Sequence, residues 1–79
     1  METAKPDIVV NVIGETCPIP LVEMRKAVMR ASAGQVIEVV GSHGASRKEI
    51  PLAVESLGLE LLSDTQDDNG AWHLTIRKP

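Results

Sequence analysis

The sequence has few of the residues that several protein classes need. Its 79 residues include one cysteine, one tryptophan, and neither tyrosine nor phenylalanine. A single cysteine cannot form an internal disulfide, which fits a reducing compartment. Its net charge of -3 and lone aromatic side chain are not those of a basic, aromatic-rich surface. We therefore expect no stable nucleic-acid binding.

Long apolar runs are also missing. None approaches the ~20 residues that a membrane helix needs, so we expect no membrane span. The opening METAKPD lacks the apolar core of a secretory signal, which predicts a cytoplasmic protein. The length suits a single domain over residues 1–79, with residues 1–6 as a flexible leader.

The first half of the chain has the pattern of a strand, a helix and a second strand. Residues 7–13, DIVVNVI, are apolar on both faces, which indicates a central strand. A helix is predicted from Pro20 to about Ser32, with Gly34 as its stop. Its apolar residues recur at helical spacing: Leu21, Met24, Val28 and Ala31. A second strand over 35–41 follows at the spacing of a parallel crossover.

The second half predicts a helix and a hairpin. Ser46 with Glu49 forms a candidate capping box, and Gly58 is a plausible stop. Its apolar positions are Ile50, Ala53, Val54 and Leu57. Pro51 falls inside this helix and should make it irregular. Residues 59–66 and 71–77 flank the turn DDNG, and the inner face of the last strand is predicted to be Trp72, Leu74 and Ile76.

The element order βαβαββ predicts an α/β (α+β) fold. We expect a two-layer α/β sandwich, in which a mixed four-stranded sheet carries two helices on one face. In this arrangement the second strand and the hairpin flank the first strand on opposite sides. The other face of the sheet is expected to be partly solvated.

The stretch GETCPIPLVEM contains the single cysteine, Cys17, at the carboxyl end of the first strand, where a helix begins. A helix N-terminus favours a thiolate, and this edge of an α/β sheet commonly binds ligands. Pro18 and Pro20 suit a helix start, and a residue before proline tends to be extended, here Cys17 and Ile19. Burial as core filler is the alternative reading of a lone cysteine.

The stretch GETCPIPLVEMRKAV resembles the CPxP signature of the TusA/SirA-like sulfur-carrier family. The resemblance covers nearly the whole chain, including EIP in the second helix and LTIRK at the end. It implies a two-layer α/β fold and a sulfurtransferase that accepts persulfide sulfur on Cys17. The implied donor is a cysteine desulfurase or a rhodanese-like protein, and the acceptor is another protein, as in a relay toward tRNA thiolation. The alternative is a noncatalytic regulatory or interaction module with a structural Cys17.

The remaining chemical groups give weaker signals. Arg25 and Lys26, with Arg30, form either a solvated helix face or a partner-binding surface, and the resemblance favours the partner. His43 follows the second strand and is a candidate for activating the thiol. His73 is expected to be a solvated strand residue. The histidines and Cys17 lack the close spacing of metal ligands, so we expect neither a metal nor another cofactor. Met24 and Met29 are expected in or near the core.

Overall fold

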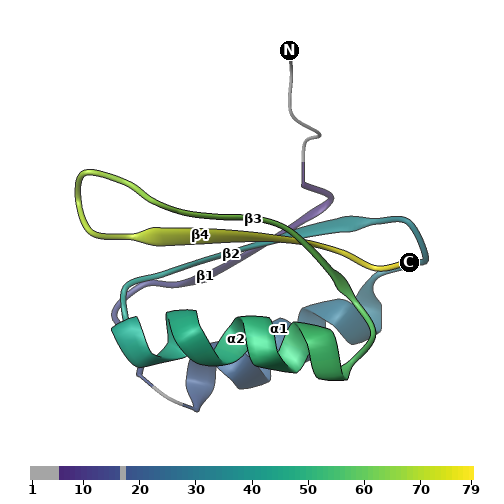
Figure 1. Cartoon of the computed structure of the whole chain (residues 1–79), viewed down its shortest axis with the longest axis horizontal. Helices are drawn as coiled ribbons and strands as arrows, with labels where there is room; N and C mark the ends of the chain where they lie inside the picture. Colours follow the sequence, from purple (N-terminus) through teal and green to yellow (C-terminus); the bar gives the residue numbers. More distant parts are fainter. Residues whose placement is uncertain (1–5, 17) are drawn as a thin grey trace.

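The computed structural model describes residues 6–16 and 18–79, which contain helices and strands in the predicted order (Figure 1). The elements are β1 (Ile8–Val12), α1 (Ile19–Arg30), β2 (Val36–Gly41), α2 (Gly44–Ser56), β3 (Glu60–Gln66) and β4 (Trp72–Arg77). No helix in this described part of the chain is long and apolar enough to cross a bilayer.

The four strands form one mixed sheet in the order β1-β2-β4-β3. β1 and β2 are parallel, as their spacing predicted, and β4 pairs antiparallel with both β2 and β3. Both helices cover the same face of the sheet (Figure 1). The predicted two-layer α/β sandwich is therefore confirmed.

The position of β1 contradicts two predictions. Its apolar side chains on both faces indicated a central strand, but β1 lies at the edge and Val9 is 58% exposed. The hairpin lies beside β2 and not across β1 from it. Both crossovers therefore step in the same direction across the sheet. Right-handed crossovers that step in one direction place their helices on one face.

The core lies between the sheet and the helices. Its most deeply buried side chains come from both layers and include Met24, Ile37, Ile50, Trp72, Leu74 and Ile76. The predicted inner face of β4 is thus confirmed. Met29 was expected in or near the core but is 81% exposed, because it lies on the outer side of α1. Leu57 is 45% exposed because it follows the last residue of α2.

The start of α2 differs from the predicted capping box. The N-cap is His43, and Ser46 lies inside the first turn, where it is only 1% exposed. Ser46 Oγ lies 2.9 Å from Nδ1 of His43, so the hydroxyl contacts the residue that precedes the helix. Pro51 lies inside α2, as predicted, and the helix continues beyond it.

The end of α1 is closed by a residue from the far end of the chain. The ammonium group of Lys78 donates hydrogen bonds to the carbonyl oxygens of Val28 at 3.0 Å and Ala31 at 2.9 Å. A cation at this position satisfies free carbonyls and complements the helix dipole. The helix is capped at Ala31, so Gly34 lies in the following turn and is not its immediate stop.

Candidate functional site

The candidate site lies at the sheet edge where β1 and β2 end. These strands are parallel, with Val12 opposite Gly41, so the loops that follow them emerge at the same edge. Both α1 and α2 begin from these loops (Figure 1). Cys17 lies outside the described residues, whereas the segments before and after it are described.

The segment before Cys17 is ordered by hydrogen bonds that its backbone amides donate. The amide of Glu15 donates to the carbonyl of Val12 at 3.0 Å, and the amide of Ile13 donates to Oδ1 of Asn11 at 3.0 Å. Gly14 has a φ of 88°, a left-handed conformation that favours glycine. Its amide donates to Oγ of Ser42 at 3.0 Å. This hydrogen bond links the loop after β1 to the loop after β2.

The segment after Cys17 begins α1. Pro18 is the N-cap, and the amide of Ile19 donates to the carbonyl of Thr16 at 2.9 Å. Ile19 is the first helical residue, so its predicted extended conformation is wrong; here the helix start prevails over the bias before proline. Pro18 is exposed and Pro20 is fully buried. The first turn has no acidic residue to offset the positive end of the helix dipole.

His43, the candidate for thiol activation, is half-buried in the loop after β2. Its ring contacts Ser46, and its carbonyl accepts a hydrogen bond from Nε1 of Trp72 at 3.0 Å. The indole is 1% exposed, so this donor comes from the core. The structure thus places His43 at the same sheet edge as the segments that flank Cys17. Its action on the thiol stays a prediction, because Cys17 is outside the described residues.

The exposed side of α1 combines cationic and apolar side chains. We define the α1 outer face as Ile19, Val22, Arg25, Lys26 and Met29, which are all exposed and share one side of the helix. Lys26 Nζ lies 3.5 Å from Oε2 of Glu23, an exposed pair of small energetic value. Sequence reasoning identified the cations but not the exposed apolar residues, because the sequence assigned Met29 to the core.

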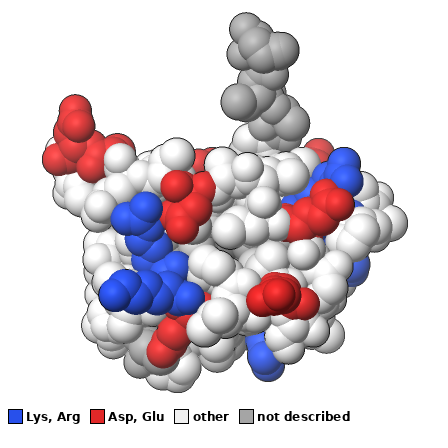
Figure 2. Space-filling view, in the orientation of Figure 1, with Lys and Arg blue, Asp and Glu red and all other residues white. Residues whose placement is uncertain are grey.

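Charged side chains elsewhere are mixed in sign. Figure 2 shows Lys and Arg side chains gathered over the start of α2, with Asp and Glu side chains close by. Arg47 lies near the start of α2, and its Nε lies 2.9 Å from Oδ1 of Asp64 on β3. Cations and carboxylates therefore lie side by side on this face.

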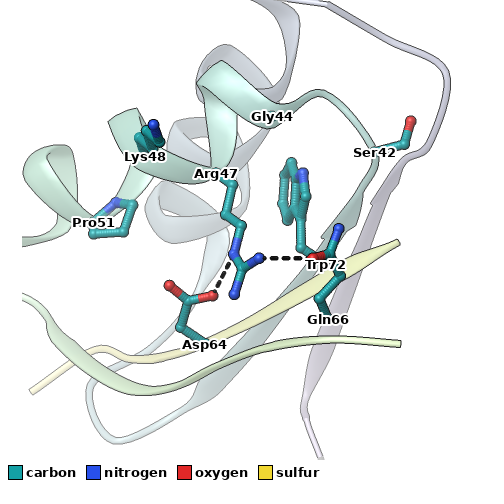
Figure 3. Close-up of a pocket in the computed structure, with 8 residues that line it drawn as sticks. All are labelled: Ser42, Gly44, Arg47, Lys48, Pro51, Asp64, Gln66 and Trp72. Atoms are coloured by element: carbon teal, nitrogen blue, oxygen red, sulfur yellow. Dashed lines mark hydrogen bonds and ion pairs between the residues drawn. The ribbon is translucent and has the colours of Figure 1, made fainter. Parts of the chain in front are cut away.

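A cavity of about 550 Å³ lies between α2 and the hairpin (Figure 3). Its lining residues are Ser42, Gly44, Arg47, Lys48, Pro51, Asp64, Gln66 and Trp72. The Arg47 side chain extends from α2 to the hairpin, where it bonds both Asp64 and the side-chain oxygen of Gln66, the latter at 3.1 Å. Sequence reasoning missed this arrangement, since the residues come from separate elements.

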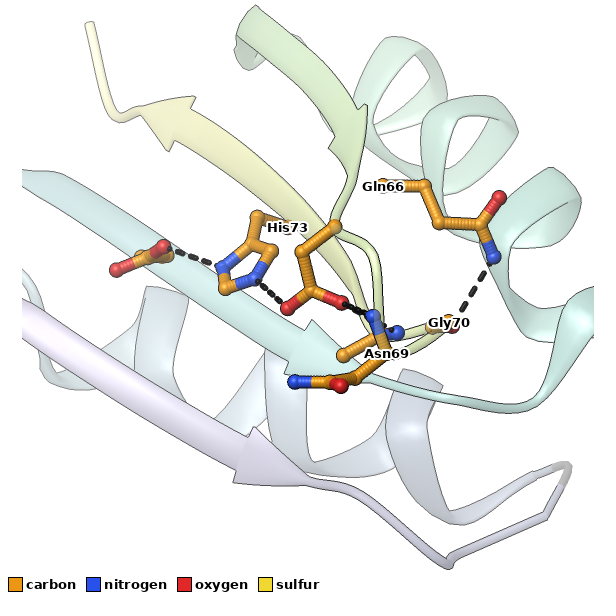
Figure 4. Close-up of polar contacts among 7 residues, drawn as sticks. Gln66, Asn69, Gly70 and His73 are labelled. Atoms are coloured by element: carbon orange, nitrogen blue, oxygen red, sulfur yellow. Dashed lines mark hydrogen bonds and ion pairs between the residues drawn. The ribbon is translucent and has the colours of Figure 1, made fainter.

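His73 is not the solvated strand residue that was predicted. Its Nδ1 lies 2.9 Å from Oε2 of Glu38, and its Nε2 lies 3.1 Å from Oδ2 of Asp67 (Figure 4). The hydrogen bond to Asp67, followed by that to Glu38, raises the pKa of His73. The hydrogen bond from His73 lowers the pKa of Asp67. No group of three His, Cys, Asp or Glu residues within the described segments could hold a metal ion.

Nearly the whole chain is similar to known proteins. The sequence model of the family described as "Sulfurtransferase TusA" matches residues 8–78. The "Sulfur carrier protein TusA" of Pseudomonas putida (strain GB-1) is 34% identical over 73 residues, covering 92% of this chain and 90% of that protein. A protein of Archaeoglobus fulgidus is 35% identical over 71 residues, covering 90% of this chain and 96% of its own.

A solved structure agrees with this relationship. The SirA-like protein from Desulfitobacterium hafniense has a TM-score of 0.81 and 30% sequence identity to this chain. The comparison covers 89% of this chain and 95% of that protein. The resemblance seen in the CPxP stretch is therefore confirmed over nearly the full length, and the chain belongs to the TusA sulfurtransferase family.

Proposed function

We propose that this protein is a sulfur carrier that accepts persulfide sulfur on Cys17 and relays it to a partner protein. The observation that carries the proposal is the TusA family match over residues 8–78, which includes Cys17 in its CPxP stretch. Membership of this family makes sulfur transfer the function that best fits a chain with a single thiol.

The proposed reaction consists of two thiol exchanges. The Cys17 thiolate attacks the outer sulfur of a donor persulfide, a new S–S bond forms, and the donor's inner sulfur leaves as a thiolate. An acceptor thiolate then attacks the outer sulfur on Cys17, and the Cys17 sulfur leaves as a thiolate. Each step exchanges one S–S bond for another, so no external oxidant or reductant is consumed. The chain has no second cysteine to attack the persulfide internally.

The start of α1 supports the thiolate form. The helix begins two residues after Cys17, and its first turn has no acidic side chain. The positive end of the helix dipole favours an anion near such a position. His43, at the same sheet edge, is a candidate for additional stabilisation of the thiolate when its ring is protonated.

The partners in this proposal are proteins. The donor class is a cysteine desulfurase or a rhodanese-like protein, and the acceptor is a second thiol protein, for example in a pathway of tRNA thiolation. The α1 outer face begins within the CPxP stretch, at Ile19, and carries Arg25 and Lys26 beside exposed apolar residues. Such a surface suits a partner with acidic groups around an apolar centre. A cytoplasmic location would supply these partners and keep the thiol reduced.

Intact-mass measurement tests the proposal directly. The protein is incubated with a cysteine desulfurase, pyridoxal phosphate and cysteine, and a gain of about 32 Da, the mass of one sulfur atom, is expected. The gain should be removed by dithiothreitol and absent in Cys17→Ser. No gain in the wild-type protein would contradict sulfur acceptance from a desulfurase and favour a noncatalytic interaction module.

A further inference from the structure

We propose that Ser42 is a positioning residue for residues 13–16, the segment that leads into Cys17. This inference rests on the proposed sulfur transfer, because positioning matters most when one protein must present its sulfur to another. Contacts that begin at Trp72 in the core and pass through the loop after β2 hold Ser42 in place.

The indole of Trp72 fixes the end of β2. Trp72 lies opposite Gly41 in the β2–β4 pairing and is only 1% exposed. A Cβ at Gly41 would lie 2.5 Å from two carbon atoms of the indole, so the ring packs directly on the glycine backbone. The residue immediately before Ser42 is therefore held by core packing.

The residue after Ser42 is held by hydrogen bonds. The carbonyl of His43 accepts the indole N–H at 3.0 Å, and the imidazole contacts the hydroxyl of Ser46. Ser46 is itself buried in the first turn of α2. Because the backbone is fixed on both sides, Ser42 has a defined position at the surface although its side chain is exposed.

Ser42 transmits this fixed position to the loop after β1. In Figure 3 its hydroxyl points away from the Trp72 ring. Its Oγ accepts the amide hydrogen of Gly14 at 3.0 Å, across 28 positions of sequence. Gly14 is three residues from Cys17 and lies inside the turn that the hydrogen bond from the Glu15 amide to the Val12 carbonyl closes. The hydrogen bond thus restrains the path by which the chain reaches the thiol.

Such a restraint should matter more for protein partners than for small reagents. Efficient transfer requires the reacting atoms to approach within about 3–3.5 Å in an aligned geometry, and a misplacement of about 1 Å can cost about 100-fold in rate. A small alkylating agent reaches the sulfur from many directions. A docked partner protein approaches the sulfur from only one direction.

Ser42→Ala and Ser42→Thr test the proposal, with Ser63→Ala, an exposed serine on β3, as the matched control. Ser42→Ala removes the acceptor, whereas threonine keeps a hydroxyl. We expect Ser42→Ala to lower the kcat of persulfide uptake from a desulfurase about tenfold. Ser42→Thr and Ser63→Ala should stay within about twofold of wild type, and all four proteins should alkylate with iodoacetamide at rates within about twofold of one another.

Amide hydrogen exchange at Gly14, measured by NMR, gives a readout that does not depend on sulfur transfer. We expect exchange about tenfold faster in Ser42→Ala and unchanged in Ser63→Ala. Unchanged Gly14 exchange, or uptake by Ser42→Ala within about twofold of wild type, would overturn the positioning role. A wild-type protein that accepts no sulfur would refute the proposed function, and Gly14 exchange would still decide whether Ser42 restrains this segment.

Discussion

The imidazole of His73 lies 2.9 Å from the carboxylate of Glu38 and joins β4 to β2 across the sheet face that the helices leave uncovered. The opposite ring nitrogen contacts Asp67, whose other oxygen accepts the backbone amides of Asn69 and Ala71. One histidine therefore connects a central strand to the hairpin turn. When both nitrogens donate, the ring is a cation between two carboxylates.

This arrangement predicts a stability that falls as the pH rises. Folding raises the pKa of His73 above 6.5. The stabilisation from protonated His73 is therefore fully present below the unfolded pKa, and it is lost as the pH rises through the raised folded pKa. The difference in unfolding free energy between wild type and His73→Gln should therefore shrink as the pH rises above 6.5 and through the raised folded pKa. Urea denaturation from acidic to alkaline pH measures this difference. Glu38→Gln should make the unfolding free energy depend less steeply on pH. A pH-independent difference would contradict the prediction.

Asp67 should have the opposite dependence at low pH. Its pKa is lowered from 3.8, chiefly by the hydrogen bond from His73, so its contribution is present above 3.8 and is lost as the pH falls through the lowered value. The difference in unfolding free energy between wild type and Asp67→Asn should therefore disappear as the pH falls through that acidic range. NMR titration of the Asp67 carboxyl carbon gives an independent check, and an inflection at or above 3.8 would contradict it.

Gly41→Ala should destabilise the protein because its new methyl group would meet the Trp72 ring. Overpacking of a closely packed core typically costs about 1–3 kcal/mol. Gly44→Ala is the matched control: nothing lies within 4 Å of its added Cβ, and Gly44 starts α2. That control should be neutral or gain up to about 1 kcal/mol from reduced chain entropy. Thermal denaturation compares the two, and equal melting temperatures would contradict the packing argument.

Arg25→Glu combined with Lys26→Glu should slow sulfur uptake with little effect on folding. Both side chains are exposed on the α1 outer face, and exposed charges typically contribute less than ~1 kcal/mol to stability. We expect uptake from a desulfurase to fall about tenfold or more at low salt because charge complementarity accelerates docking. Lys48→Glu, at an exposed position on α2, is the charge-reversal control and should leave sulfur uptake within about twofold of wild type. A large drop in melting temperature would assign Arg25 and Lys26 a structural role instead.

Pro18→Ala and Pro20→Ala should have different consequences because Pro18 is exposed and Pro20 is fully buried. Pro18→Ala should keep its melting temperature within about 2 °C and its alkylation rate, but relay sulfur to an acceptor protein several-fold more slowly. Pro20→Ala also removes buried ring atoms and should cost about 1–2 kcal/mol. If Pro18→Ala relays sulfur at the wild-type rate, Pro18 only starts the helix and does not position Cys17.

Local patterns in the sequence determined the kind and order of the elements. Apolar residues at helical spacing predicted α1, and alternation of Trp72, Leu74 and Ile76 predicted the inner face of β4. The number of residues between the first two strands predicted a parallel crossover, which the pairing of β1 with β2 confirms. The CPxP stretch indicated the family and identified Cys17 as the candidate sulfur acceptor. It could do so because such a motif consists of neighbouring residues in the sequence.

Only the tertiary structure decided the relationships between distant residues. The edge position of β1 depends on which strand the hairpin joins, and no local pattern specifies this choice. Ser42 and Gly14 are 28 residues apart, and Glu38 and His73 are 35 apart, yet each pair forms a hydrogen bond. Periodicity reports which face of an element is apolar. The partner of a polar side chain is chosen by sheet pairing, which brings separate segments to the same edge or face.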